Sequence, residues 1–325
     1  MYRITAVVAL LSIAIWAWNS SRLVGAPEDG ETKLLSHRGV HQQFSYDGLT
    51  NDTCTAERML EPTHAYLENT LPSILEAFEA GADIVEIDVH PTTDGHWAVF
   101  HDWTLDCRTV GRGRTRDASR AELKTLDVGY GYTADDGETF PFRGIYVGGM
   151  PMLDEVFDAF PNQRFLLNFK SSEAEEGTAF AAYLRAHSKW QDNIFGVYGG
   201  GANPVDAFRA EFPDIRGYSR PSMKACLLDY GLWGWTGRVP MSCRDTYLII
   251  PVSHAKWLWG WPHKLTQRLE RVGTEVILLG PHKATNIGSR GIDGEEELAG
   301  VPDGFDGYIW TNRIEVIGPL LKEAD

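Results

Sequence analysis

Eight short apolar runs rich in β-branched residues occur along this chain, and stretches with helical periodicity separate several of them. Strands that alternate with helices build βαβ units, and repeated βαβ units form a parallel sheet. A chain of 325 residues suits one large domain, and α/β barrels often use this length as one. The predicted strands are Lys33–Ser36, Ile84–His90, Arg164–Phe169, Asn193–Val197, Ile215–Tyr218, Tyr247–Val252, Glu275–Leu279 and Gly307–Thr311.

Helices are predicted between several of these strands. Apolar residues from Leu71 to Phe78 fall at positions i, i+3, i+4 and i+7, which places them on one face of a helix. Thr70 can cap the start of this helix, and Gly81 can end it. Further helices are predicted around residues 153–157, 179–187 and 265–272, whereas the connections after the fifth and seventh strands are expected to be irregular.

Two segments between the predicted elements look like insertions. Residues 41–66 are polar and turn-forming, and residues 108–150 are rich in Gly, Arg and Asp with little periodicity. Both follow the carboxyl end of a predicted strand, where barrel enzymes carry their active sites. We expect both insertions to form walls or a lid near that face.

The N-terminal residues are typical of a targeting segment. Arg3 precedes an uncharged run from Ile4 to Trp18, which is long enough for the core of a signal peptide. A membrane span needs about 20 apolar residues, so this run is short for one. Pro27 directly follows a Gly-Ala pair and would hinder cleavage there. We expect residues 1–27 to be a signal peptide or an N-terminal membrane anchor and residues 30–325 to form the main domain; a buried N-terminal helix is the alternative.

The four cysteines are consistent with export. None lies in a Cys-x-x-Cys spacing, so a zinc or redox motif is not indicated. An even number after an export signal favours disulfides, although four cysteines allow three pairings among which the sequence does not choose. We favour Cys54 with Cys107 and Cys226 with Cys243, in a periplasmic, secreted or membrane-anchored protein. In a cytosolic protein the four would be buried thiols.

The net charge of −15 restricts the kinds of partner. Nucleic-acid binding needs a cationic face that displaces counterions, so we expect no nucleic-acid partner. An anionic small substrate remains compatible with this charge, because a bound cation can invert the local field.

Two carboxylates lie two residues apart on the second predicted strand. Side chains with this spacing point to the same face, so Glu86 and Asp88 share a face, which His90 continues. A buried pair of carboxylates is unfavourable without a partner, and such hard oxygen ligands suit Mg²⁺ or Ca²⁺. The alternative is a solvated edge strand with alternating charge, which the apolar neighbours of the pair disfavour.

Other candidates follow the ends of apolar runs. These are His37 and Arg38 after the first predicted strand, His101 after the run that ends at Phe100, and Lys170 after the third predicted strand. A single histidine is more often structural, and each cation is as often a salt-bridge partner. Two histidines beside a carboxylate pair, however, can act as base and acid around a metal-bound anion. The two cations can neutralise phosphate oxygens.

Further motifs surround these candidates in a fixed order. They are His37-Arg38-Gly39, Glu68-Asn69-Thr70-Leu71-Pro72, Glu86-x-Asp88-Val89-His90, Asp94-Gly95, Val99-Phe100-His101-Asp102, Thr104-Leu105-Asp106, Glu122-Leu123-Lys124-x-Leu126-Asp127, Pro151-x-Leu153-x-Glu155-Val156, Lys170, and Phe305-Asp306-Gly307-Tyr308-Ile309 with Thr311-Asn312-Arg313. With this set the chain resembles the glycerophosphodiester phosphodiesterase family. The resemblance is strong over residues 33–170 and faint over residues 190–320, and the ordered set is more specific than any single motif.

This resemblance implies an α/β fold, the TIM (β/α)8 barrel, with loop insertions near the active-site face. It also implies one divalent cation, Mg²⁺ or Ca²⁺, and hydrolysis of a glycerophosphodiester to an alcohol and glycerol 3-phosphate. By position it implies a general acid–base pair (His37 and His101), phosphate contacts (Arg38 and Lys170), metal ligands (Glu86 and Asp88, with Asn168 at the third ligand position) and two further residues in the site (Glu68 and Asn69).

The chain departs from the family pattern at the third ligand position. The family usually has a glutamate ligand two residues before the lysine of the third strand, where this chain has Asn168. An amide oxygen can coordinate Mg²⁺ or Ca²⁺ but brings no charge, so we expect weaker cation binding unless Glu68 or substrate oxygens compensate. A second departure is Thr311-Asn312, which stands where the family has a final Thr-Asp pair. The insertion at residues 41–66 is longer than is usual in the family.

Three functions remain open on the sequence. The first is metal-dependent hydrolysis of small glycerophosphodiesters. The second is a phospholipase D-like reaction on lysophospholipids or sphingomyelin, with membrane-surface contact through the N-terminal segment and five tryptophans between Trp233 and Trp261. Packing within loops is the alternative role of these tryptophans. The third, which Asn168 admits, is a non-catalytic barrel that binds head groups.

Overall fold

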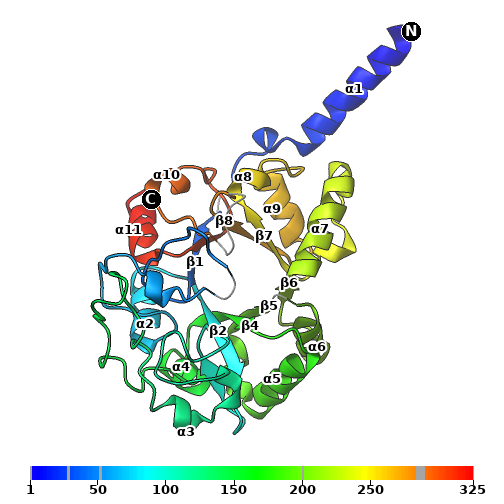
Figure 1. Cartoon of the computed structure of the whole chain (residues 1–325). Coiled ribbons are helices and arrows are strands. Elements are labelled where there is room, and N and C mark those ends of the chain that lie inside the picture. Colours follow the sequence, from blue (N-terminus) through cyan, green and yellow to red (C-terminus); the bar gives the residue numbers. More distant parts are fainter. Residues whose placement is uncertain (1, 28–29, 51–52, 200, 283–289, 325) are drawn as a thin grey trace.

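Eight parallel strands form a nearly closed α/β barrel in the computed structural model, which describes residues 2–27, 30–50, 53–199, 201–282 and 290–324 (Figure 1). Their hydrogen-bonded order is β6-β5-β4-β2-β1-β9-β8-β7, and the short strand β3 pairs with β2 in the antiparallel sense. The strands are β1 Thr32–His37, β2 Ile84–Pro91, β3 Trp97–Val99, β4 Arg164–Phe169, β5 Ile194–Gly199, β6 Gly217–Ser219, β7 Tyr247–Pro251, β8 Glu275–Leu279 and β9 Gly307–Thr311. All eight predicted strands are confirmed, and so is the barrel; β3 is additional.

A seam separates β6 from β7, which stand at the two ends of the hydrogen-bonded path. Side chains cross it: the hydroxyl of Thr246 donates to the carbonyl of Gly217 (2.8 Å). The hydroxyl of Tyr247, on β7, donates to the carbonyl of Phe195, on β5. The ring of strands is therefore completed here by side chains.

Helices surround the barrel (Figure 1). They are α1 Tyr2–Asn19, α2 Leu71–Glu79, α3 Arg120–Leu123, α4 Leu153–Ala159, α5 Ala174–Ala186, α6 Asn203–Glu211, α7 Arg220–Trp233, α8 Val252–Ala255, α9 His263–Glu270, α10 Glu295–Leu298 and α11 Ile314–Ala324, with 3₁₀ turns that include η5 Gly234–Thr236 and η6 Met241–Cys243. The three helices predicted at residues 153–157, 179–187 and 265–272 correspond to α4, α5 and α9.

The connection after the fifth predicted strand was expected to be irregular. This prediction is wrong, because helix α7 forms most of the first half of that connection. Its apolar residues point in both directions: Cys226 and Tyr230 are buried, whereas Leu228 and Leu232 are exposed. The sequence therefore lacks the one-sided apolar pattern by which a helix is predicted. Of the residues after the seventh predicted strand, 283–289 lie outside the described part of the chain.

Helix α2 begins at Leu71, as predicted, but two details differ. Thr70 does not cap it through its side chain; the hydroxyl of Thr70 donates instead to the carbonyl of Leu67 (2.7 Å). Leu75 is exposed, so the apolar face is narrower than the spacing predicts. The buried side chains of α2 are Ser73, Ile74 and Ala77.

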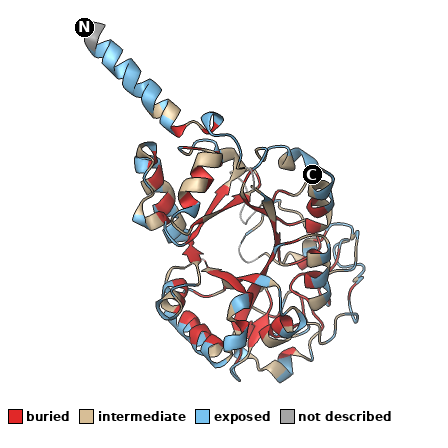
Figure 2. Cartoon of the chain, turned by 180° about the vertical axis from the view of Figure 1, so that it is seen from behind, coloured by how far each residue is buried: buried red, intermediate tan, exposed pale blue. Residues whose placement is uncertain are grey.

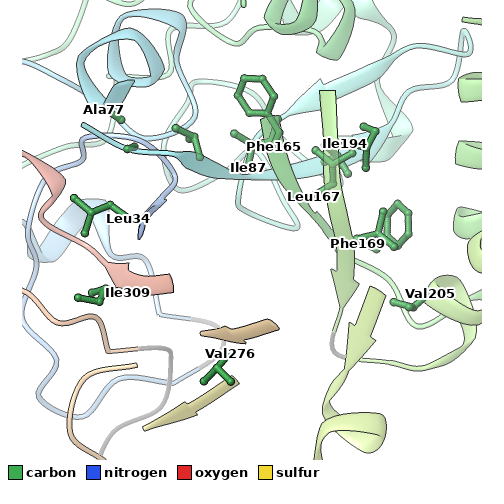
Figure 3. Packing of buried hydrophobic residues seen from close by; sticks show 14 of the residues in the cluster. Leu34, Ala77, Ile87, Phe165, Leu167, Phe169, Ile194, Val205, Val276 and Ile309 are labelled. Atoms are coloured by element: carbon green, nitrogen blue, oxygen red, sulfur yellow. The ribbon is translucent and has the colours of Figure 1, made fainter. Parts of the chain in front are cut away.

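Two apolar layers lie on opposite sides of the strands. Leu34 and Leu167 point outward into the layer between strands and helices (Figure 3). Their neighbours Leu35 and Leu166 point into the barrel interior, as the alternation of side chains along a strand requires. Because both sides are covered, the strands are buried along most of their length (Figure 2).

The two predicted insertions pack against each other. A disulfide joins Cys54 in the first insertion to Cys107, the residue directly before the second. Ala56, Met59 and Leu67 from the first side form an apolar cluster with Tyr132 and Phe142 from the second. The other favoured disulfide, between Cys226 and Cys243, is also present, so both pairings are confirmed.

Helix α1 extends away from the barrel (Figure 1). Most of its side chains are exposed, so the alternative of a buried N-terminal helix is wrong (Figure 2). Within the described residues, none of the helices combines the length and the apolar character that crossing a bilayer requires.

Candidate active site

The polar residues singled out in the sequence meet at the carboxyl ends of β1, β2 and β4. In the register of these parallel strands, His37 lies opposite Glu86, and Asp88 lies opposite Asn168. Lys170 directly follows β4. Barrel enzymes carry their catalytic groups at this end of the strands. The contacts below connect all nine candidate residues into one site.

Asp88 is fully buried at the centre of the site and has four polar neighbours. Its Oδ1 accepts from Nζ of Lys170 (3.0 Å) and from Nδ2 of Asn168 (2.9 Å). Its Oδ2 accepts from Nδ2 of Asn69 (3.0 Å) and lies 3.2 Å from Nε of Arg38. Burial opposes ionisation, but the two cations outweigh it and hold the pKa of Asp88 well below its usual value. Asp88 is therefore an anion that organises both predicted phosphate contacts.

Glu86 has a different environment from Asp88, although both are fully buried. Its Oε1 accepts from the hydroxyl of Tyr198 (2.6 Å), and its Oε2 has no hydrogen-bond partner. Nε2 of His37 is 3.8 Å from that second oxygen. Burial, reinforced by the charge of Asp88, raises the pKa of Glu86 to about 8. Unlike Asp88, this carboxyl group has no Arg or Lys side chain in direct contact with it among the described residues.

The donor set around these two carboxylates fits a hard divalent cation. The orphaned Oε2 of Glu86 is a buried oxygen with a free lone pair, and carboxylate and amide oxygens are what Mg²⁺ and Ca²⁺ prefer. Within the described residues no group of three or more His, Cys, Asp or Glu side chains is placed to hold a metal ion. The position that would complete such a group is Asn168, whose amide can offer an oxygen only by turning away from Asp88.

His37 is held in one orientation by Asn312. Its Nδ1 lies 2.6 Å from Oδ1 of Asn312, whose Nδ2 in turn donates to Oδ2 of Asp293 (2.9 Å). This arrangement fixes the amide oxygen toward the ring, so His37 carries its proton on Nδ1 and its lone pair on Nε2. Burial, assisted by the charge of Arg38, keeps the pKa of His37 well below its usual value. His37 is thus a neutral imidazole with an available base nitrogen.

His101 has a charged partner. Its Nδ1 lies 2.7 Å from Oδ1 of Asp102, and Oδ2 of Asp102 accepts from Nε of Arg108 (2.9 Å). Burial and then the charge of Arg38 lower the pKa of His101. Burial opposes ionisation of Asp102, but Arg108 outweighs it and lowers the pKa of that carboxyl group. Asp102 stays ionised and can stabilise a proton on His101.

Glu68 joins the two halves of the site. It is buried, and its Oε1 lies 3.3 Å from Nη1 of Arg38 and 3.3 Å from Nη2 of Arg108. Burial raises the pKa of Glu68, but Arg108 and Arg38 together bring it below its usual value. The chain Asp102–Arg108–Glu68–Arg38 therefore links one histidine to the central carboxylate.

The backbone is strained at two residues of the site. Arg38 and Asn69 have positive φ angles, 61° and 58°, although neither is glycine. The amide of Arg38 donates to the carbonyl of Glu86 (2.9 Å), and the amide of Asn69 donates to the carbonyl of Arg38 (2.9 Å). These bonds hold both side chains toward Asp88, and such strain is common at functional sites.

Four functional residues were not singled out as such by the sequence. Asn312 and Asp293 orient His37, Tyr198 binds Glu86, and Arg108 is 2% exposed and binds two acidic residues. Of these four residues, only Asn312 lies in a motif of the family resemblance, Thr311-Asn312-Arg313. Arg108, Asp293 and Tyr198 lie outside the motifs, and their importance arises from tertiary contacts.

His90 lies outside this network. It is fully buried, and neither ring nitrogen has a hydrogen-bond partner in the described structure. Burial, with the charge of Lys170, lowers its pKa to about 3.

Comparisons with known proteins concern the family and the fold. Residues 37–193 match the glycerophosphoryl diester phosphodiesterase family. A glycerophosphodiester phosphodiesterase of Caldanaerobacter subterraneus subsp. tengcongensis is 40% identical over 103 residues, which are 32% of this chain and 39% of that protein. One from Bacillus subtilis is 34% identical over 114 residues, 34% of this chain and 38% of that protein. The matched part thus spans about two-fifths of the length of these curated relatives.

Solved structures share the fold. The glycerophosphoryl diester phosphodiesterase domain of an uncharacterised Mycobacterium tuberculosis protein has a TM-score of 0.62 at 14% identity, covering 91% of this chain and 100% of that one. An Oleispira antarctica phosphodiesterase, in complex with the product sn-glycerol-3-phosphate, has a TM-score of 0.53 at 19% identity, covering 91% of this chain and 97% of that one.

Proposed function

Since this chain belongs to the glycerophosphoryl diester phosphodiesterase family, we propose that it hydrolyses glycerophosphodiesters to an alcohol and glycerol 3-phosphate. One observation carries the proposal. His37 and His101 are each bound at Nδ1, so each leaves Nε2 for the substrate, on a site centred on Asp88. Phosphodiester hydrolysis requires a general base and a general acid, which the two histidine nitrogens can supply. It also requires positive charge near the phosphate, which Arg38 and Lys170 can supply.

The partners of the two histidines support different roles for them. His37 faces the neutral amide of Asn312, which favours the unprotonated ring. We therefore take His37 as the base that removes a proton from the attacking water as its oxygen bonds to phosphorus. His101 faces the carboxylate of Asp102, which stabilises an imidazolium, so His101 protonates the leaving alkoxide. The negative charge of a bound phosphodiester raises the pKa of His101 and prepares it for this role.

Arg38 and Lys170 bind the phosphate oxygens in this proposal. Both lie against Asp88, at 3.2 and 3.0 Å, which fixes their charges at one place before substrate arrives. Asn69 holds the same carboxylate, and Glu68 holds Arg38. Glu86, Asp88 and the amide of Asn168 would hold one divalent cation, Mg²⁺ or Ca²⁺. When bound, this cation supplies charge neutralisation at a phosphate oxygen and lowers the pKa of the attacking hydroxyl.

We also propose that the protein works outside the cytoplasm. Its two disulfides are typical of oxidising compartments. A periplasmic, secreted or membrane-anchored location would expose it to glycerophosphodiesters and lysophospholipids. Exposed tryptophans such as Trp257 favour a lysophospholipid as a second class of substrate.

The test is a product assay with the full chain. Glycerophosphocholine, glycerophosphoglycerol and a micellar lysophospholipid are each incubated with Mg²⁺, Ca²⁺ or chelator. Glycerol 3-phosphate is measured for the two soluble diesters, and lysophosphatidic acid and its cyclic phosphate for the lysophospholipid. We expect turnover of the soluble diesters with a cation, and a loss of about 10²–10⁴-fold in His37→Ala and in His101→Ala. Near-wild-type turnover by both variants would refute the scheme.

Two other outcomes would reassign the function. Turnover of the lysophospholipid alone, with a lysophosphatidic or cyclic phosphate product, would indicate the phospholipase D-like reaction. Binding of the head groups without any hydrolysis under all cation conditions would indicate a non-catalytic barrel.

A further inference from the structure

The C-terminal end of α1 is docked on the barrel. Nδ2 of Asn19 donates to the carbonyl of Trp235 (2.9 Å), and Nη1 of Arg268 donates to Oδ1 of Asn19 (2.8 Å). The hydroxyl of Ser21 is buried and donates to the carbonyl of Gly260 (2.6 Å). Cleavage beyond this point would leave Arg268 and both carbonyls without these partners. The contacts therefore favour a helix that stays attached.

The rest of α1 is apolar and exposed. Between residues 4 and 19 the helix has no charged side chain. Ile4, Leu10 and Trp16 are 71%, 66% and 59% exposed. A helix that is apolar on all sides is normally surrounded by a protein core or by lipid. In the described part of the chain, most of α1 is left uncovered by other residues.

Tryptophans gather where α1 meets the barrel. Nε1 of Trp18 donates to the carbonyl of Thr236, just beyond α7, and Nε1 of Trp259 donates to the carbonyl of Gly231, within α7. Figure 1 shows α1 leaving the barrel on the side of α8 and α9, with α7 next to them. Of the tryptophans that are exposed in the described structure, six lie here and one, Trp103, does not. The six are Trp16, Trp18, Trp233, Trp235, Trp257 and Trp259.

Aliphatic side chains extend this region, which we call the docking surface: α1, the six tryptophans, Leu228, Leu232 and Met241. The last three are 58%, 67% and 78% exposed. The disulfide between Cys226 and Cys243 fixes α7 to the turn that carries Met241. Soluble monomers rarely expose apolar surface of this extent, so the docking surface requires a partner.

The same region is basic in an otherwise acidic chain. Residues 220–268 contain seven Lys or Arg and two Asp, a net charge of +5, whereas the whole chain has −15. Ion pairs with carboxylates in the described residues lie outside this stretch, the nearest in sequence being Arg216–Glu275. Nζ of Lys256 lies 5.7 Å from the centre of the Trp257 ring. The basic residues are Arg220, Lys224, Arg238, Arg244, Lys256, Lys264 and Arg268.

We propose that α1 is retained in the working protein and that the docking surface binds an anionic lipid bilayer. Tryptophan prefers the boundary between hydrocarbon and head groups, because it has a large apolar ring and one N–H donor. Lysine and arginine beside it attract anionic head groups. An apolar helix can bury itself in lipid, and tryptophans beside basic side chains suit the boundary between hydrocarbon and anionic head groups. This proposal stands whether or not the barrel hydrolyses glycerophosphodiesters.

Vesicle flotation of the full chain tests the proposal. Vesicles of phosphatidylcholine alone are compared with vesicles that also contain phosphatidylglycerol. We expect wild-type protein to float with the anionic vesicles. Trp233→Ser with Trp257→Ser should lower the partition coefficient at least roughly tenfold on both kinds of vesicle. Lys224→Gln with Lys256→Gln should lower it roughly 25-fold on anionic vesicles only, since each basic residue near a charged membrane contributes about fivefold.

The matched control replaces two exposed apolar residues elsewhere, Ile145 and Val147, which are 67% and 63% exposed. Ile145→Ser with Val147→Ser should float as wild type does. Equal flotation of this control and of the tryptophan variant would overturn the proposal. So would wild-type protein that self-associates through the same tryptophans without binding vesicles, or a protein isolated from its host membranes whose intact mass lacks residues 1–27.

Discussion

Arg108 donates from Nε to Oδ2 of Asp102 at 2.9 Å, so the carboxylate that orients His101 has a partner on each oxygen. Arg108 also binds Glu68, which binds Arg38. An arginine outside every recognised motif is thereby connected to both a proposed catalytic histidine, His101, and a proposed phosphate contact, Arg38. We regard Arg108 as a positioning residue.

Replacement of Arg108 by methionine should lower kcat by about 10–100-fold, because Asp102 and Glu68 lose their shared cation. Removal of the positive charge also raises the pKa of His101, so the alkaline limb of the kcat/KM profile should move to higher pH. Arg112→Met is the matched control, since the Arg112 side chain is 84% exposed. A lower kcat with an unmoved pH profile would leave Arg108 a purely structural role.

Asn312→Leu should remove the acceptor that fixes the tautomer of His37. The proton of His37 is then free to move to Nε2, where it blocks the base nitrogen, and kcat should fall by about 10²–10⁴-fold. KM should change little, because the cations that bind phosphate are untouched. The measurement is steady-state kinetics, and an equal rise of KM with constant kcat would contradict the role assigned to Asn312.

Asn168→Glu should strengthen cation binding. A third anionic oxygen replaces a neutral amide, so the cation concentration for half-maximal activity should fall by about tenfold or more. In chelator the same variant should be less stable than wild type, since Asp88 loses an N–H donor and faces a new negative charge. Asn168→Gln, which keeps the amide, is the control. An unchanged half-activating concentration would mean that position 168 does not contact the cation.

The stability of the metal-free protein should depend on Glu86. Its folded pKa of about 8 lies above the ordinary value of 4.5, so the folded state binds the extra proton between these values. The contribution of Glu86 to stability is therefore fully present at low pH and declines as pH rises through this window, by at most about 1.4 kcal/mol per unit. Glu86→Gln should remove this slope.

Chemical denaturation in chelator at about pH 5 and about pH 8 measures the difference between wild type and Glu86→Gln. The variant should gain stability relative to wild type at the higher pH. Excess divalent cation should cancel that gain, because it favours the ionised carboxylate. A pH-independent difference would show that the carboxyl group titrates normally.

The disulfide between Cys54 and Cys107 should matter to activity as well as to stability. It closes a sequence separation of 53 residues, and loss of such a link lowers the free energy of unfolding by about 4 kcal/mol. It also precedes Arg108, whose Nη2 donates to Thr55 next to Cys54. The double variant Cys54→Ser, Cys107→Ser should therefore lose kcat at temperatures where it is still folded.

The other disulfide provides the control for this prediction. Cys226 and Cys243 are 17 residues apart, and their replacement should lower the free energy of unfolding by about 3 kcal/mol. Hydrolysis of a soluble diester should be unchanged in folded protein. Equal losses of kcat in both double variants would show that the first disulfide acts only through global stability.

The strands and the motifs that come together at their carboxyl ends could be predicted from the sequence because their signals are local. Each parallel strand is covered on both sides, so it appears as an apolar run, and Glu86 and Asp88 interrupt such a run at a spacing of two. The packing of the insertions was not accessible, since Tyr132 and Phe142 meet Met59 across more than 70 residues without periodicity. Arg108 and Asp293 belong to the same class, because an isolated charged residue acquires its role only from tertiary neighbours.

The seam between β6 and β7 gives the second disulfide a role of its own. Cys226 lies in α7 and Cys243 in η6, and both belong to the segment that connects the two unpaired edge strands. The disulfide shortens the stretch of chain that joins β6 to β7 across the seam. Reduction of this disulfide would therefore lengthen the free connection across the seam, and Trp233 at the end of α7 lies on that connection.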